Sequence, residues 1–323
     1  MLATLAGAVP RRITREGIAL EHHIREGRFQ RSLALVTAMS SLLSGLEVTY
    51  EHYRGSYGQQ VMYTPVFLSA ALALTAVWAA LSRWAARVAL PIVSLLIVVD
   101  GFVGFYFHIR GVARKPGGWR IPVMNVIMGP PVFAPLLFAL SGYLGLIASF
   151  LGREDDPAHS TLPGLPRPKP GILALLPVGI RREGVILEQH VREGRFQRHV
   201  AFVAGLSALF SGVEALYSHY KDNFTDPKLQ WSPILLTPVM LFAGVGTIWS
   251  RRIARTLLPV VSMVAVLDGT VGFFFHVRGV LGRPGGLKAP LYNLIYGPPV
   301  FAPLLFAASG LMGLLASLLR RAH

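Results

Sequence analysis

Four histidines occupy matched positions near the ends of long apolar segments, two in each half of the chain. They are His52 and His108 in the first half and His219 and His276 in the second. Counted along the segments, each half places its two imidazoles at one membrane depth on different helices. A four-helix bundle uses such a pair to hold a b-type haem or a His-ligated metal. Histidine beside tyrosine is also typical of an aromatic membrane interface, which is the alternative interpretation.

Four acids lie within or at the end of the same segments: Glu47, Asp100, Glu214 and Asp268. An ionised carboxylate is costly there unless it is paired, protonated or in contact with water, so we expect these acids to handle protons or cations. Asp100 precedes His108 by eight residues, which keeps acid and imidazole on roughly one side of a helix. Glu47 and His52 lie about 140° apart round their helix and are poor co-ligands of one ion. The alternative is a hydrogen-bonded, ion-paired helix end.

A loop rich in proline and glycine follows each aspartate-bearing segment on the expected outer side. It reads ARKPGGWRIPVMNVIMGPP from residue 113 and LGRPGGLKAPLYNLIYGPP from residue 281. The matched prolines and glycines predict a fixed, non-helical path in which the asparagine bonds free backbone groups. Such a loop could bind an anion or dock a partner subunit, or simply join two helices. The residues concerned are Arg110, Arg120, Asn125, Arg278, Lys288 and Asn293. Arg110 and Arg278 are also the arginines that we expect to pair with Asp100 and Asp268.

The composition places the chain in a lipid bilayer. Mean hydropathy is +0.51, with 53% hydrophobic and 15% charged residues, which is too apolar for an ordinary soluble domain. The formal net charge of +15 comes from basic blocks between apolar runs, which indicates lipid headgroups rather than nucleic acid as the partner. The lack of cysteine excludes disulfides, cysteine-held iron–sulfur clusters and c-type haem attachment. No nucleotide-binding glycine loop or HExxH motif occurs, so enzymatic activity is left open.

The chain contains an internal duplication. ITREGIALEHHIREGRFQR at residues 13–31 matches IRREGVILEQHVREGRFQR at residues 180–198, and DGFVGFYFHIRG from Asp100 matches DGTVGFFFHVRG from Asp268. The sequence therefore predicts a first repeat at residues 1–152, a proline-rich surface linker at 153–171 and a second repeat at 172–323. Each repeat opens with an amphipathic segment that we expect to lie as an interfacial helix on anionic lipid.

The elements that position the candidate residues are eight apolar runs of about 20 residues. We expect spans at Ser32–Tyr50, Tyr63–Ser82, Val88–Phe107, Pro131–Leu151, His199–Tyr217, Ser232–Ser250, Thr256–Phe275 and Pro299–Leu319. The predicted fold is an all-α integral membrane protein with about eight transmembrane helices in two tandem, parallel four-helix repeats. Lys and Arg favour one side about two to one, which predicts cytoplasmic N- and C-termini, in a bacterial inner membrane.

Three functions fit this pattern. The first is a membrane-anchor subunit of a redox complex that holds haem b or a metal through the outer histidines and passes electrons to quinone. Other protein subunits would then bind its outer face. The second is a proton- or cation-coupled transporter of small solutes, built from parallel repeats. Pro91 and Pro259 lie near the inner helix ends rather than mid-membrane, which disfavours transport. The third is a structural subunit of a larger membrane complex without a cofactor.

Overall fold

The protein is an all-helical membrane protein. The computed structural model describes residues 11–155, 186, 189–225 and 227–321, and these residues form helices and no β-strand. Six helices are long and apolar enough to cross a membrane: Gln30–Arg54, Gln60–Leu81, Ala85–Ala113, Gln197–Lys221, Leu229–Thr247 and Leu257–Leu281. Large apolar side chains such as Phe67 and Leu74 are more than two-thirds exposed on these helices. Such a surface suits lipid contact.

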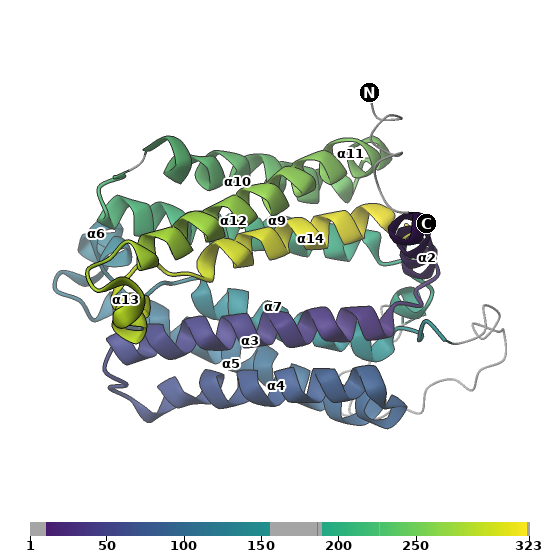
Figure 1. Cartoon of the computed structure of the whole chain (residues 1–323), viewed down its shortest axis with the longest axis horizontal. Coiled ribbons are helices and arrows are strands. Elements are labelled where there is room, and N and C mark those ends of the chain that lie inside the picture. The colour runs from purple at the N-terminus through teal and green to yellow at the C-terminus, as the bar shows by residue number, and fades with distance from the viewer. Residues whose placement is uncertain (1–10, 156–185, 187–188, 226, 322–323) are drawn as a thin grey trace.

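In each half, three long helices precede a short helix and a helix of 17 residues (Figure 1). The first half contains α2 (Arg11–Arg25), α3 (Gln30–Arg54), α4 (Thr64–Leu81), α5 (Leu90–Ala113), α6 (Pro122–Ile127) and α7 (Ala134–Phe150). The second contains α9 (Gln197–Lys221), α10 (Pro227–Thr247), α11 (Arg251–Arg255), α12 (Leu257–Leu281), α13 (Pro290–Tyr296) and α14 (Ala302–Leu318). We call the end that carries α2 and α11 the arginine end, and the end that carries α6 and α13 the loop end.

Helix neighbours are also the same in both halves. α3 and α5 each pack against α4 and α7, and α9 and α12 each pack against α10 and α14. The first and third long helices of a half therefore lie across its bundle from each other. Small residues permit the closest of these contacts, because a Cβ at Gly142 would meet the backbone of α5 at Ser94 and a Cβ at Gly310 would meet that of α12 at Ser262.

Two expectations about helices needed revision. The last apolar run of each half, expected from residue 131 to 151 and from 299 to 319, forms a helix of only 17 residues. The chain before each of these helices is extended or bent because it carries the GPP sequence, whose prolines lack a donor for the first turn. The outer loops were predicted to be non-helical, which is wrong in part. Pro122 and Pro290 each occupy the first helical position of a short helix, where the missing N–H costs nothing.

The halves meet at the arginine end through two glycines. Gly27 and Gly194 both have positive φ, and a Cβ on Gly27 would lie 2.8 Å from the backbone nitrogen of Gly194. α2, which precedes Gly27 in the chain, packs against α14 of the second half. The carbonyl of its last residue, Arg25, accepts a hydrogen bond of 2.5 Å from Arg320 Nε. The described chain therefore begins and ends at the arginine end (Figure 1).

The predicted linker lies mostly outside the described residues. Its first residue, Arg153, does not behave as part of a surface linker, because its side chain is only 5% exposed. The guanidinium donates to the Ala79 and Ala80 carbonyls at 3.4 and 3.0 Å and so satisfies the last carbonyls of α4. The packed first half thus extends at least to Arg153.

Candidate functional site

The four candidate histidines lie at the loop end, and three of them are fixed by backbone carbonyls. Nδ1 of His52 lies 2.7 Å from the Met62 carbonyl, that of His108 lies 2.5 Å from Pro131, and that of His276 lies 2.6 Å from Pro299. A carbonyl oxygen can only accept, so each Nδ1 must carry the proton. In the neutral ring Nε2 then keeps its lone pair, which is the form that a metal ligand requires.

The structure brings the histidines together in pairs across each bundle. The rings of His219 on α9 and His276 on α12 have centroids 6.4 Å apart and planes at 88°. In the first half, His52 on α3 and His108 on α5 are close enough to interact electrostatically. The described chain thus brings the two candidate imidazoles of each half near each other, and their role as ligands stays a prediction.

The aspartates bond hydroxyl groups rather than the arginines considered from the sequence. Asp100 Oδ1 accepts a bond of 2.6 Å from Thr64 Oγ1, and Asp268 accepts one from Ser232. Asp100 also lies within electrostatic range of His52. Among the ion pairs of the described residues, none joins either aspartate to an arginine. Each aspartate is half-buried and has one hydroxyl partner, and the carboxylate within electrostatic range of His219 and His276 is Asp222 rather than Asp268.

The two glutamates have a structural role that the sequence did not predict. Glu214 Oε1 in the second half accepts a bond of 2.7 Å from the backbone N–H of Phe133, which precedes α7 in the first half. Glu47 accepts reciprocally from the backbone of Phe301, which precedes α14. A carboxylate at a helix N-terminus satisfies free N–H groups and the helix dipole. Each half therefore caps a helix of the other, while Tyr50 also donates to Glu47 at 2.5 Å.

Aromatic packing supports the same exchange between the halves. The Phe133 ring stacks on Phe210 of α9, with centroids 4.8 Å apart and planes at 6°. Phe133 therefore contacts the second half through both its backbone and its side chain. The partners in these contacts are about 80 residues apart in sequence, so no local pattern could have revealed them.

The outer loops are held by their asparagines, as the sequence predicted. Asn125 Nδ2 donates to the carbonyls of Pro116 and Gly118 at 3.0 and 2.8 Å. Asn293 makes the matching bonds to Pro284 and Gly286 at 3.2 and 3.1 Å. Both side chains are buried, so their role is to fix the loop. Arg110, Arg120, Arg278 and Lys288 lie on or next to these loops and are left as candidates for contact with a partner.

An apolar cavity of about 360 Å³ opens at the loop end, where the two halves meet. It lies between α6 of the first half and α9 of the second, on the segment that carries His219. Its lining residues are Pro122, Val123, Val126, Ile127, Leu216, Tyr217 and Tyr220. A cavity of this size and lining suits a flat apolar group better than an ion.

Two further findings limit how the site can be interpreted. Within the described residues, no group of three or more His, Cys, Asp or Glu side chains converges as a metal site. No family model, curated protein or solved structure matches the chain.

Proposed function

We propose that the protein is a membrane subunit of a redox complex in which each half holds a b-type haem between its two loop-end histidines. The observation that carries this proposal is the histidine pair on two helices facing each other across a bundle. Carbonyl bonds at Nδ1 orient the rings of His52, His108 and His276 and leave Nε2 free to ligate. Ligating histidines commonly have this kind of hydrogen-bonded support.

The spacing of His219 and His276 would suit two imidazoles that hold one haem. Imidazoles on opposite sides of one ion have centroids roughly 6 Å apart, because each metal–nitrogen bond is about 2.0 Å long and each ring adds its radius. The observed separation is 6.4 Å. A bare metal ion would need more than two protein ligands, which the described residues do not bring together. A b-type haem would need only two imidazoles from the protein, and His219 with His276 would supply them.

The proposal also assigns roles to the apolar cavity, the four acids and the basic residues of the loops. A bound haem would supply one-electron transfer, and the apolar cavity near His219 offers a place for a quinone ring. We assign proton handling to Asp100, which lies within electrostatic range of His52, and to Asp268, which holds the matching position in the second half. Glu47 and Glu214 are engaged as helix caps and contribute stability instead. The basic residues of the outer loops would bind a partner subunit.

We further propose that both halves are copies of one unit and that the chain crosses the membrane eight times. α7 and α14 are each about 25 Å long at about 1.5 Å per residue, and the extended chain before them can complete a crossing. An even number of crossings agrees with both described ends lying at the arginine end. The positive-inside rule places that end, and both termini, in the cytoplasm of a bacterial cell.

Cysteine labelling tests this topology, since the chain has no cysteine of its own. Trp119 and Leu287 are exposed on the two outer loops, and Arg252 is exposed at the arginine end. We expect an impermeant thiol reagent to label Trp119→Cys and Leu287→Cys in intact cells and Arg252→Cys only after lysis. The reverse pattern would refute the orientation without affecting the haem assignment.

A visible absorption spectrum tests the haem assignment. The protein purified with its native partners should show a Soret band, and His108→Ala and His276→Ala should each remove one of two spectral components. His22→Ala is the control, because His22 is an exposed residue of α2 that pairs with Glu26 at the opposite end. A colourless preparation without haem, from cells that supply it, would contradict the proposal and favour a structural subunit.

One observation favours transport as a second candidate. Pro91 and Pro259 lie near the inner helix ends, but α10 also contains Pro233 and Pro238 within the helix. Ser232, which bonds Asp268, directly precedes the first of them. α10 is continuous, but prolines within a membrane helix leave backbone carbonyls without their helical donors, and such carbonyls beside a membrane acid can bind a coupling ion. Loss of solute uptake in Asp268→Asn, with assembly intact and no haem bound, would support transport over the redox proposal.

A further inference from the structure

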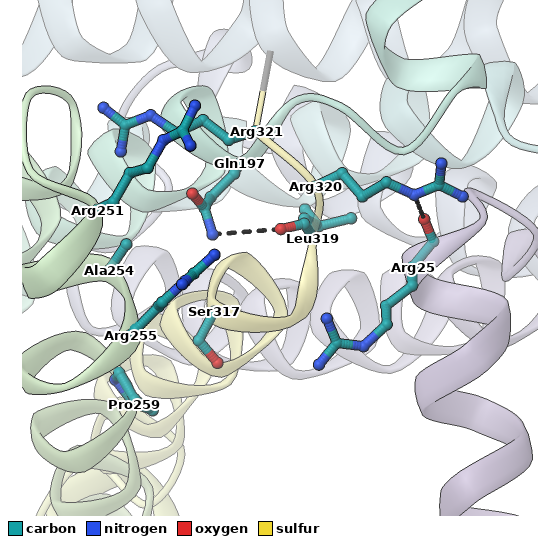
Figure 2. A pocket seen from close by; sticks show the side chains of 10 residues that line it. All are labelled: Arg25, Gln197, Arg251, Ala254, Arg255, Pro259, Ser317, Leu319, Arg320 and Arg321. Atoms are coloured by element: carbon teal, nitrogen blue, oxygen red, sulfur yellow. Dashed lines mark hydrogen bonds between the residues drawn. The ribbon is translucent and has the colours of Figure 1, made fainter. Parts of the chain in front are cut away.

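A basic cavity of about 610 Å³ opens at the arginine end, opposite the histidine pairs (Figure 2). Five arginines from three parts of the chain contribute to its lining. Arg25 comes from α2 of the first half, Arg251 and Arg255 come from α11, and Arg320 and Arg321 follow α14. Figure 2 shows Arg251, Arg255 and Arg321 on one side of the cavity and Arg25 with Arg320 on the other.

The positive charge of this cavity has little compensation. No acidic residue lines it, and among the described residues no ion pair involves Arg251, Arg255, Arg320 or Arg321. Only the Arg25 guanidinium has a carboxylate partner, Glu21 at 2.7 Å. Arg320 and Arg321 donate instead to neutral carbonyls, that of Arg25 for the former and those of Thr247 and Ile248 for the latter.

Arg321 is affected by the other positive charges around it. Its Nε is buried and has no hydrogen-bond partner. Burial lowers the pKa of Arg321, and the charges of Arg198 and Arg251 lower it further. A cluster of guanidiniums that repel one another and retain an unused donor is the arrangement that an anion stabilises.

The matching site in the first half contains its own anions. Arg153 corresponds to Arg321, and the next two residues are Glu154 and Asp155. Asp155 pairs with Arg31 at 3.1 Å and with Arg153 at 3.3 Å. In the second half the matched residues are Ala322 and His323, which lie outside the described residues. The second half therefore keeps the counterparts of Arg83, Arg87 and Arg153, gains Arg320 where the first half has Gly152, and lacks these two acids.

We infer that the arginine cavity of the second half binds a phosphate group, carried by an anionic lipid headgroup or by a soluble phosphate compound. Guanidiniums converging from different elements match the oxygens of a phosphate, which accepts several charge-assisted bonds at once. The amide of Gln197 faces the same space but already donates to the Leu319 carbonyl at 3.2 Å. The arginines therefore supply the donors.

The position of the cavity makes a lipid a natural source of that phosphate. Pro259 lines the cavity, and the next residue of α12, Val260, is 61% exposed. Leu311 on the adjacent α14 is 50% exposed. A headgroup in the cavity would thus have an apolar surface beside it for acyl chains, and basic pockets between membrane helices commonly bind phospholipid headgroups in this way.

Binding by the full-length protein to two probes tests the inference and distinguishes the sources. The soluble probe is inorganic pyrophosphate, measured by calorimetry in neutral detergent. The lipid probe is phosphatidic acid in phosphatidylcholine nanodiscs, measured as lipid retained per protein by mass spectrometry. We expect Arg251→Gln with Arg255→Gln to weaken binding about tenfold or more, since two charge-assisted contacts are lost.

A matched control removes the same charge elsewhere at this end. Arg83→Gln with Arg252→Gln changes two exposed arginines that do not line the cavity, and we expect less than about a twofold change. Arg251→Lys with Arg255→Lys keeps the charge and should lie between the two, because lysine lacks the planar fork. Thermal unfolding of each variant separates lost binding from lost folding.

The outcomes separate clearly. Phosphatidic acid binding that depends on Arg251 and Arg255 identifies a lipid, and pyrophosphate binding without lipid preference identifies a soluble phosphate compound. Equal weakening in the control double variant would reduce the effect to general surface charge and overturn the inference. Binding of neither probe by the wild-type protein would overturn it as well.

Discussion

At the arginine end the two halves make similar helix contacts but differ in how far acidic side chains neutralise their arginines. Arg153 and Arg321 each donate to the last carbonyls of the second long helix of their half, α4 or α10. Around Arg153 the cation is balanced by Asp155, and Glu154 bonds the first turn of α3. Around Arg321 the neighbours are more arginines and a cavity. The two halves thus keep the contacts that hold helices together and differ in what surrounds them.

The difference indicates which features of this end are structural. A guanidinium that satisfies helix-terminal carbonyls is needed in both halves, because buried carbonyls without partners are costly. Counter-charges have no such constraint, since an anion from the chain and an anion from outside can serve the same arginines. In the first half the chain's own acids can therefore neutralise the arginines, while in the second half the arginines remain available to an external anion.

The largest loss of stability is expected at Gly27 and Gly194, the matched glycines through which the two halves contact each other. Gly27→Ala and Gly194→Ala should each destabilise the protein by about 4 kcal/mol, because a Cβ requires strained positive φ and overlaps the other glycine's backbone. Unfolding in a detergent titration followed by circular dichroism measures this. Unequal losses at the two glycines would show that the halves differ even at their contact.

Replacing Arg153 or Arg321, which donate to helix-terminal carbonyls, should destabilise the two halves by different amounts. Arg153→Ala should cost about 3 kcal/mol, because the side chain is buried and bonds two carbonyls and Gln30. Arg321→Ala should cost about half as much, since its removal also relieves repulsion from Arg198 and Arg251. The same titration compares the two variants. A larger loss for Arg321→Ala would mean that the cavity arginines stabilise the fold rather than strain it.

Removing Glu154 should make the arginine end of the first half resemble that of the second in its capacity to bind phosphate. Glu154 accepts from the backbone N–H groups of Arg31 and Ser32 at 3.1 and 3.0 Å, in the first turn of α3. Glu154→Ala should therefore cost about 1 kcal/mol of stability. It should also raise phosphate binding at the first half, measured by calorimetry. Unchanged stability would show that this cap is not needed.

The smallest effect is expected from relieving repulsion in the cavity. Arg251→Gln should stabilise the protein by about 0.5 kcal/mol at low ionic strength, and added salt should abolish the gain. Arg83→Gln, the matched change in the first half, should not stabilise. Thermal unfolding at two salt concentrations provides the measurement. Destabilisation by Arg251→Gln at low salt would argue against a strained cluster of like charges.

Much of the fold was predictable because its signals are local. Apolar runs and their spacing indicated the long helices, and the amphipathic segment before the first run indicated α2. The bonds of Asn125 and Asn293 were also predictable, since their partners lie within nine residues in a loop shaped by proline and glycine. The helices inside those loops were missed, because proline ends a helix as readily as it begins one.

The sequence by itself determined that this chain is a helical membrane protein with histidines and acids at matched places in its two halves. Hydropathy and repetition suffice for that, because both are read one segment at a time. Only the tertiary structure decided what those residues contact. Glu47 and Glu214 each cap a helix of the other half, and five arginines from distant segments line one cavity. Such contacts depend on how helices pack in space, and residues far apart in sequence leave no periodic trace of the packing that joins them.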